Sequence, residues 1–425
     1  MSSPRLTTAA LLALVVACLW VTGAFEGCVH PGRIGHVSEP PPAQAGEHAL
    51  ILVSIDGFRH DYLDREDADI PTLRGLAEKG VRADGMVPVF PSVTLPNHWS
   101  LVTGVHPEEH GIVGNEFRAA DGRLFDGDRK TGMIQPEWWG GEPIWVTAQR
   151  QGLRTGTVMW PGSQAIPASR GVPYDADMPY AARVDTALAW LDLPPAQRPR
   201  FLTLYFEAVD GAGHRHGPDT PQTARAMERV DRALARLVDG LAARGARQTT
   251  DLVIVSDHGM TELSRERLVF LDDAADLDAE AEHVLWDTPT HIWPREGVDV
   301  DALVARLDAL DHVRAFRREN TPAHLHFRQS DRIAPVVVLP DEGWSVTTRA
   351  RAAASPQFPI AGSHGFDVRN RSMHATFFAH GPSFRAHARV QTIATVDVYT
   401  ILAHALGIQP APNSGDAKVL QLVLR

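Results

Sequence analysis

From residue 49 onward, short unbroken apolar runs alternate with polar stretches of helical periodicity. The clearest runs are Ala49–Ile55, Gly152–Met159, Phe201–Phe206 and Asp251–Ser256. Continuous apolar runs of this length are typical of parallel strands that are buried on both faces. Pro71–Lys79 carries proline at its first position and is followed by glycine, which predicts a helix. The alternation predicts an α/β fold with a central, mostly parallel sheet and helices on both faces.

Two further helices are predicted from apolar spacing. One begins at Thr220-Pro221 and the other, a closing helix, covers Val396–Leu406. The first repeats apolar residues at spacings of three and four, which indicates a core-facing stripe and not a cofactor-binding motif. The residues of this stripe are Met227, Val230, Leu234, Leu237 and Leu241.

The pattern changes at about residues 262–354, where the strand-like runs become less apolar and Asp299–Leu310 indicates a short helix. We expect a smaller inserted subdomain there. The central sheet is expected to resume near Gly362–Gly365 and Met373–Ala379. Residues 49–425 then form one catalytic domain that carries this insertion.

The first 28 residues resemble an export signal, with Arg5 followed by the apolar run Leu6–Val21. Val15–Cys18 resembles a bacterial lipoprotein cleavage site. A lipoprotein site at Cys28 and a conventional signal that ends at Ala24 are the alternatives for cleavage. A single membrane anchor is the alternative, although the run is short for a spanning helix. We expect export to the periplasm, or an outer-membrane-associated lipoprotein, in a Gram-negative bacterium.

Composition narrows the choice of chemistry. The chain has 425 residues, a net charge of −11 and two cysteines, both before residue 30. This acidity argues against a protein that holds polymeric nucleic acid by charge, but bound cations could still attract a small phosphate ester. The body has no thiolate for a metal site, so any catalytic metal needs nitrogen and oxygen ligands. Residues 29–48 are rich in proline and predict a linker.

The stretch Phe90–Gly104 presents the hydroxyl of Thr94 at the expected start of a helix. A threonine hydroxyl becomes a nucleophile when a base or metal takes its proton. Carboxylates and imidazoles follow the strand-like runs and would gather at one edge of the sheet. Each of these residues alone also has a purely structural interpretation; Asp56, for example, could cap a helix. The set is Asp56, Asp210, His214, Asp257, His258 and His364.

These ligand types suit two divalent cations, and two Zn²⁺ ions are expected. The glycine-rich run Asp210–His214 is expected to form a turn that brings both side chains to one ion. Asn115 is expected to donate to a developing oxyanion. One ion, held by Asp56, Asp257 and His258, would lower the pKa of Thr94. The other, held by Asp210, His214 and His364, would stabilise the leaving oxygen.

Together these motifs resemble the alkaline phosphatase superfamily and, within it, the nucleotide pyrophosphatase/phosphodiesterase family. The resemblance runs from about Ala49 to the C-terminus. The stretches that carry it are Ser54–Arg59, Pro91–Gly104, His110–Asn115, Trp160–Ser163, Asp210–Pro218, Ser256–Met260 and Gly362–Asp367.

The resemblance implies two zinc ions on the six ligands above, with Thr94 as nucleophile and further metal ligand and Asn115 as oxyanion donor. It also implies that Tyr174 and Tyr205 flank a nucleobase. The chain departs from the family at Leu95, where an aromatic residue is usual. Leucine offers apolar contact but cannot stack on a base. Stacking of a base on an aromatic side chain is worth about 1–3 kcal/mol in proteins that bind single-stranded nucleic acid.

The leading hypothesis is a two-zinc phosphodiesterase/pyrophosphatase that releases nucleoside 5′-monophosphates through a covalent threonyl intermediate. Its partner would be a small nucleotide or phosphodiester. A phospholipid- or choline-type phosphodiesterase and a phosphomonoesterase stay open as alternatives. A sulfatase is disfavoured because no Cys or Ser followed by Pro-x-Arg stands at the nucleophile. A non-catalytic metal-binding relative is disfavoured by the intact ligand set. A lipid anchor and the oligomeric state stay open.

Overall fold

The computed structural model describes residues 48–127, 130–355 and 358–425. The expected export signal (1–28) and all of the expected linker except His48 lie outside the described residues, so both stay predictions. Across the described ranges, no helix is long and apolar enough to cross a membrane.

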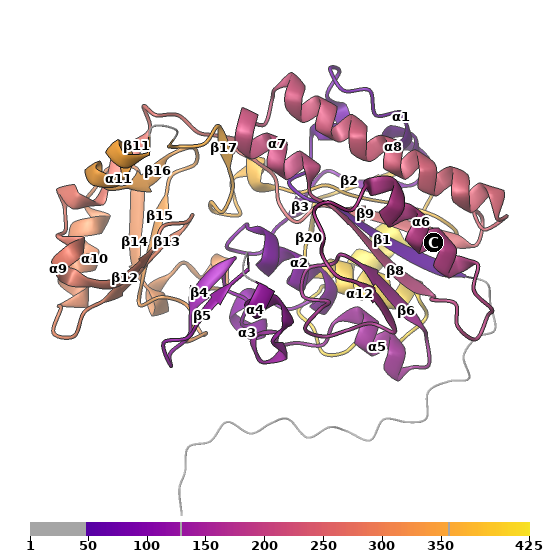
Figure 1. The fold of residues 1–425 in the computed structure, drawn as a ribbon, viewed down its shortest axis with the longest axis horizontal. Helices are drawn as coiled ribbons and strands as arrows, with labels where there is room; N and C mark the ends of the chain where they lie inside the picture. The colour runs from indigo at the N-terminus through magenta and orange to yellow at the C-terminus, as the bar shows by residue number, and fades with distance from the viewer. Residues whose placement is uncertain (1–47, 128–129, 356–357) are drawn as a thin grey trace, which may run out of the picture. The chain divides into compact units, whose positions relative to one another are not determined.

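An eight-stranded sheet forms the centre of the fold (Figure 1). Strand β18 runs antiparallel to both of its neighbours, and every other neighbouring pair in this sheet is parallel. The predicted α/β fold with a mostly parallel sheet is therefore confirmed. In spatial order the strands are β19 (Ala388–Val390), β2 (Val81–Ala83), β18 (Phe377–His380), β9 (Thr250–Val255), β1 (Ala49–Ile55), β8 (Phe201–Phe206), β6 (Thr155–Val158) and β7 (Arg170–Val172).

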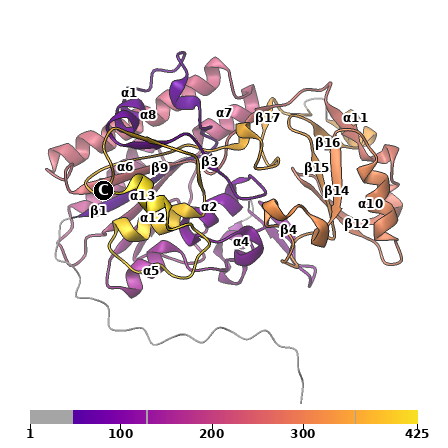
Figure 2. The same cartoon turned by 180° about the vertical axis from the view of Figure 1, so that it is seen from behind.

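Helices cover both faces of this sheet, as Figures 1 and 2 show from opposite sides. Successive residues of β1 point to opposite faces. Leu50 and Leu52 belong to one hydrophobic core, and Ile51 and Val53 to the other. The first core is closed by α2 (Thr94–Thr103), α5 (Ile144–Arg150), α12 (Asp397–Ala405) and α13 (Val419–Val423), and the second by α1 (Pro71–Lys79), α6 (Tyr180–Leu191), α7 (Ala208–His216) and α8 (Pro221–Ala243).

The predicted helices are present. Thr220 caps α8 by accepting a hydrogen bond from the backbone N–H of Thr223, and the five stripe residues of this helix are buried. Helix α12 matches the expected closing helix but does not close the chain, because α13 follows it. Five residues are too few to display a helical period in the sequence, so α13 was not predicted.

A second, smaller sheet lies between residues 281 and 340 (Figure 1). Its four strands are all antiparallel to their neighbours. One face packs against α10, and on the other face Val337 and Leu339 join the core of the large sheet. The elements of this region are α9 (Leu277–Glu280), β12 (Ala281–Leu285), β13 (Thr290–Pro294), α10 (Val300–Asp308), β14 (Val313–Arg317), β15 (Val336–Pro340) and α11 (Arg349–Ala354), with a parallel pair β11 (Leu268–Phe270) and β16 (Ser345–Thr347).

One expectation about the return to the central sheet was wrong. β17 (Gly362–Ser363) does not join that sheet but pairs antiparallel with β10 (Thr261–Glu262). The central sheet resumes at β18, fourteen residues after β17. The short β10–β17 ladder brings the two ends of the intervening segment together. The remaining short elements are β3 (Met86–Val87) with β20 (Ile393–Ala394), β4 (Glu116–Arg118) with β5 (Leu124–Asp126), α3 (Pro107–His110) and α4 (Lys130–Ile134).

Candidate metal centre and active site

The candidate site forms at the carboxyl ends of β1 and β9, where open α/β sheets place their ligands. Asp56 follows β1 directly, and Asp257 lies two residues beyond the end of β9. Gly57 adopts a φ of +67°, and a Cβ there would lie 2.8 Å from the Cα of Asp210. Glycine at this turn therefore lets Asp210 approach Asp56, and the backbone N–H of Asp210 donates to the carbonyl of Asp56 (3.0 Å).

The run Asp210–His214 is not the turn that we expected but part of helix α7. The helix still brings the two side chains together, because residues four apart share one face. His214 Nε2 lies 3.3 Å from Asp210 Oδ1. The glycine at 213 serves packing, since a Cβ there would lie 2.8 Å from the Met260 side chain.

Thr94 occupies the first turn of α2, and the loop before it is fixed by the buried Asn97. The amide nitrogen of Asn97 donates to the carbonyls of Val89, Pro91 and Val93, and its oxygen accepts from the N–H of Val89. The N-terminus of a helix favours negative charge through its free N–H groups and its dipole. The Thr94 hydroxyl is therefore held rigidly where an anionic group is stabilised.

Three histidines point the same ring nitrogen into the site. The Nδ1 atoms of His258, His214 and His364 each lie 2.9 Å from a backbone carbonyl, those of Gly259, Gly362 and Ser92 respectively. Each Nδ1 therefore carries the proton and each Nε2 presents a lone pair, which is the tautomer of a metal-ligating histidine.

The Nε2 atoms converge closely. Those of His214 and His364 are 3.1 Å apart, and that of His258 lies 3.4 Å from the Thr94 hydroxyl and 3.1 Å from Asp257 Oδ2. Two lone pairs directed at one another repel unless a cation lies between them. This convergence is the geometry expected of a cation site.

The carboxylates fit the same conclusion. One oxygen each of Asp56, Asp210 and Asp257 is buried without a hydrogen-bond partner within the described structure. Burial, and then the charges of Asp257 and Asp210, raise the pKa of Asp56 well above its usual value. Three carboxylates so close together can all ionise only if positive charge is added. The residues present therefore fit bound divalent cations.

Grouped by distance, the donor atoms form two sets, each within 4.8 Å: Asp210 with His258 and His364, and Asp56 with His98 and Asp257. The prediction from the sequence places His258 on the same ion as Asp56 and Asp257. The His258 and His364 rings stack with centroids 3.6 Å apart, which explains why His258 lies between the sets. The division of the ligands between two ions stays a prediction.

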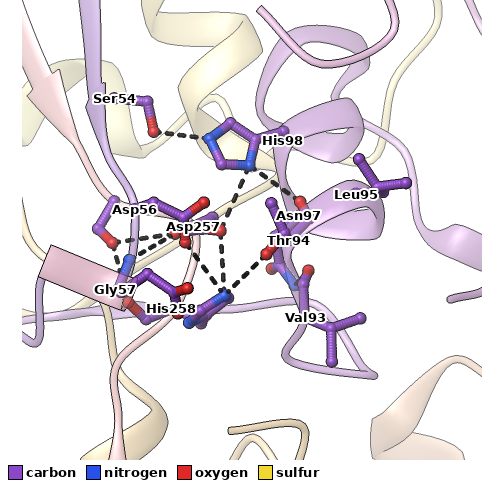
Figure 3. Close-up of polar contacts among 12 residues, drawn as sticks. Ser54, Asp56, Gly57, Val93, Thr94, Leu95, Asn97, His98, Asp257 and His258 are labelled. Atoms are coloured by element: carbon purple, nitrogen blue, oxygen red, sulfur yellow. Dashed lines mark hydrogen bonds and ion pairs between the residues drawn. The ribbon is translucent and has the colours of Figure 1, made fainter. Parts of the chain in front are cut away.

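His98 is a member of this cluster that sequence reasoning missed (Figure 3). Its Nδ1 lies 2.9 Å from the carbonyl of Thr94 and 3.3 Å from Asp257 Oδ2, and its Nε2 lies 2.8 Å from the Ser54 hydroxyl. Both ring nitrogens have partners, the Nδ1 on the Thr94 carbonyl and the Nε2 on the Ser54 hydroxyl. His98 therefore positions Asp257 and the Thr94 backbone. Its spacing of four residues from Thr94 on a helix was the available signal.

Asn115 lies beside the nucleophile. Its side-chain oxygen accepts from the backbone N–H of Leu95 (2.9 Å), so its NH₂ group turns away from the helix start. For this NH₂ group the described residues provide no acceptor, and it remains available to a ligand. Asn115 also lines a cavity next to the site. This placement suits a donor to a phosphoryl oxygen.

The predicted base-contacting residues differ in exposure. Leu95 is buried, whereas Tyr174 is 46% exposed, and its ring centroid lies 6.1 Å from that of Tyr205. Tyr205 is buried and donates its hydroxyl to Asp56 Oδ2 at 2.5 Å. Burial, and then Asp56, raise the pKa of Tyr205, which keeps this hydroxyl protonated. Tyr205 thus orients a carboxylate of the cluster, a contact that the sequence did not predict.

A doubly covered α/β sheet with carboxylates and imidazoles at its carboxyl edge fits the alkaline phosphatase superfamily. The sequence profile of the family described as type I phosphodiesterase / nucleotide pyrophosphatase matches residues 50–367. The chain belongs to this family and is an enzyme of the hydrolase class. The family is metal-dependent and acts on small-molecule nucleotide substrates.

Individual relatives support the same family assignment. An uncharacterized pyrophosphatase/phosphodiesterase of Schizosaccharomyces pombe is 34% identical over 87% of this chain and 79% of the relative. Venom phosphodiesterase 2 of Crotalus adamanteus is 33% identical over 90% of this chain and 48% of its own length. The chain thus spans about half the length of the venom relative.

Solved structures show the same fold. Murine ectonucleotide pyrophosphatase/phosphodiesterase 5 superposes with a TM-score of 0.81 at 30% identity, covering 88% of this chain and 100% of that one. An inactive threonine-to-alanine variant of the murine protein, in complex with AMP, gives a TM-score of 0.82 at 29% identity with the same coverage.

Proposed function

We propose that this protein is a two-zinc phosphodiesterase/pyrophosphatase that cleaves nucleotide diesters or pyrophosphates and releases nucleoside 5′-monophosphates. The observation that carries the proposal is the convergence of the Nε2 atoms of three histidines with three carboxylates, with one of these nitrogens, that of His258, 3.4 Å from the Thr94 hydroxyl. Mixed imidazole and carboxylate ligands favour zinc among the common divalent cations. When bound, the ions would lower the pKa of the Thr94 hydroxyl and offset negative charge on the phosphoryl and leaving oxygens.

The reaction then follows from the placement of the chain's own groups. The Thr94 hydroxyl gives up its proton to water and its Oγ1 attacks phosphorus. The bond from phosphorus to the leaving oxygen breaks, and that oxygen takes a proton from water. The NH₂ group of Asn115 donates to a non-bridging oxygen as negative charge develops there. Water then attacks the threonyl intermediate, the bond from phosphorus to Thr94 Oγ1 breaks, Oγ1 regains a proton from water, and the monophosphate is released.

The nucleoside would lie against Leu95, Tyr174 and Tyr205. Tyr174 and Tyr205 lie close enough to form one wall, and the AMP complex of the murine neighbour supports a nucleotide substrate. Tyr205 also fixes Asp56, so its replacement would disturb the metal site together with the base contact.

The deciding experiment compares kcat/KM of the zinc-loaded enzyme on the p-nitrophenyl ester of thymidine 5′-monophosphate and on p-nitrophenyl phosphate. We expect a preference for the diester of about a hundredfold or more, because the site provides contacts for a second substituent. A preference for the monoester would replace this proposal with a phosphomonoesterase. Chelation should abolish both activities and lower Tm, and zinc should restore both, because the unshielded carboxylates repel one another.

A further inference from the structure

A cavity of about 260 Å³ lies next to Asn115, between the loop that precedes Thr94 and the small sheet. One wall is formed by Pro91 and Val93. The opposite wall is the hairpin between β12 and β13, residues 285–291. The small sheet thus reaches the candidate site through this hairpin.

None of the three predicted base contacts lines the cavity. Figure 3 shows Val93 and Leu95 leaving the start of α2 in different directions, and Val93, not Leu95, lines the cavity. The hairpin packs on the residue after His364, because a Cβ on Gly365 would lie 2.0 Å from the Thr288 carbonyl oxygen. Asp287 is also close enough for its charge to act on His214. The cavity therefore borders the ligands that the mechanism assigns to the leaving oxygen.

The lining of the cavity includes a negative charge. Asp287 is an exposed carboxylate in its wall, and no Lys or Arg lines it among the residues that the structure describes. Arg351 lies over the Trp286 ring, 4.6 Å from its centroid, but is not a lining residue. A pyrophosphate leaving group, with its several negative charges, would be repelled here.

His291 gives the cavity a specific polar contact. It is 6% exposed, lines the cavity, and its Nδ1 has no hydrogen-bond partner in the described part of the chain. Burial lowers the pKa of His291 to about 4, so the ring is neutral near pH 7. A buried polar atom without a partner is costly unless a ligand supplies one. A neutral ring nitrogen can accept from, or donate to, an uncharged polar group.

We propose that this cavity is the leaving-group subsite and that it accepts an uncharged or cationic alcohol in preference to pyrophosphate. The inference rests on the proposed function and names its preferred substrate class, a nucleoside 5′-phosphodiester of such an alcohol. Trp286 supplies apolar contact in the cavity wall, Asp287 supplies the charge opposite to that of an ammonium group, and His291 contacts a polar atom.

The test uses three substrates that release the same AMP: its choline ester, its methyl ester and ATP. Their leaving groups are cationic, neutral and polyanionic. Intrinsic reactivity differs among them, so the measured quantity is the change in each kcat/KM between wild type and variant. The variants are Asp287→Asn, which removes the charge, and Asp287→Lys, which reverses it. Asp278→Asn is the matched control, because it removes an exposed carboxylate from the same region outside the cavity.

Asp287→Asn should lower the ratio of choline ester to ATP by about tenfold and Asp287→Lys by more, because opposite charges respond oppositely to one carboxylate. The kcat/KM for the methyl ester should change by less than about threefold in both variants. The control Asp278→Asn should leave the ratio of choline ester to ATP unchanged. Calorimetry on Thr94→Ala should show weaker binding of the choline ester when Asp287→Asn is added.

Two results would overturn the inference, and they are distinguishable. In the first, wild type cleaves the esters and ATP, but both Asp287 variants show the same ratio of choline ester to ATP as the control. The subsite assignment is then wrong, and the proposed function still holds. If wild type cleaves none of the three substrates, the proposed function fails and the subsite fails with it.

Discussion

The two sheets of this protein differ in what their strand ends contribute. Every residue of β1 in the large sheet is buried, and this strand ends at a cluster ligand, Asp56. In the small sheet β14 has one exposed and one half-buried residue, and the hairpin after β12 carries cavity residues in place of ligands. The buried strands of the large sheet fix their ends rigidly, and a hairpin at the rim of the small sheet can vary without disturbing them.

This difference has a consequence for mutations. Replacements at the edge of the large sheet should reduce turnover by orders of magnitude or release metal. Replacements in the hairpin of the small sheet should change which substrates are preferred and leave the metal content intact.

The largest effect is expected for Thr94→Ala, which removes the nucleophile. Diester turnover should fall by about a thousandfold or more. Zinc content, measured by mass spectrometry, should stay unchanged because the six other ligands remain. Thr186→Ala is the matched control, since that hydroxyl contacts a carbonyl of its own helix, that of Ala182 at 2.8 Å. Unchanged turnover in Thr94→Ala would remove the threonine from the mechanism.

Asn115→Ala should lower kcat by about a hundredfold, the usual effect of losing one oxyanion donor. Asn115→Asp keeps an acceptor for the backbone N–H of Leu95 but loses the donor, so it separates the two contacts of this side chain. Equal losses in both variants would support the donor role. Full activity in Asn115→Asp would show that Asn115 positions α2 and does not contact the substrate.

His98→Gln should weaken zinc binding by about ten- to a hundredfold, as measured by competition with a chelator, because the ring positions Asp257. Ser54→Ala removes the hydroxyl at His98 Nε2 and leaves the ring in place, so its effect should be smaller. If Ser54→Ala and His98→Gln weaken zinc binding equally, the contact to Asp257 carries no weight.

The smallest effect is expected in the small sheet. Trp286→Ala should raise KM for the preferred diester by about three- to tenfold through lost contact area, with zinc content unchanged. Trp344→Ala, on the same region but outside the cavity, is the control. Loss of zinc or of all turnover in Trp286→Ala would contradict the claim that the small sheet affects substrate preference and leaves the metal site intact.

Much of the fold could be predicted because buried parallel strands are continuous apolar runs. Ala49–Ile55 and Phe201–Phe206 match β1 and β8 at both ends, and Pro71–Lys79 matches α1. The small sheet is harder to predict because two of its strands, β12 and β14, mix exposed and buried positions. The short ladder of β10 and β17 depends on pairing between residues about a hundred apart, which no local pattern reports.

The sequence by itself predicted that these carboxylates and imidazoles gather, because such residues that follow apolar strands have few places to go except one sheet edge. The tertiary structure decided which nitrogen of His214 and His364 faces the site, since carbonyls distant in sequence hold the other nitrogen, whereas the Nδ1 of His258 lies at the carbonyl of its neighbour Gly259. Only the tertiary structure brought His98 to Asp257, Tyr205 to Asp56 and the hairpin to Asn115. Such contacts depend on the packing of whole elements, and a residue's own neighbours in sequence do not record them.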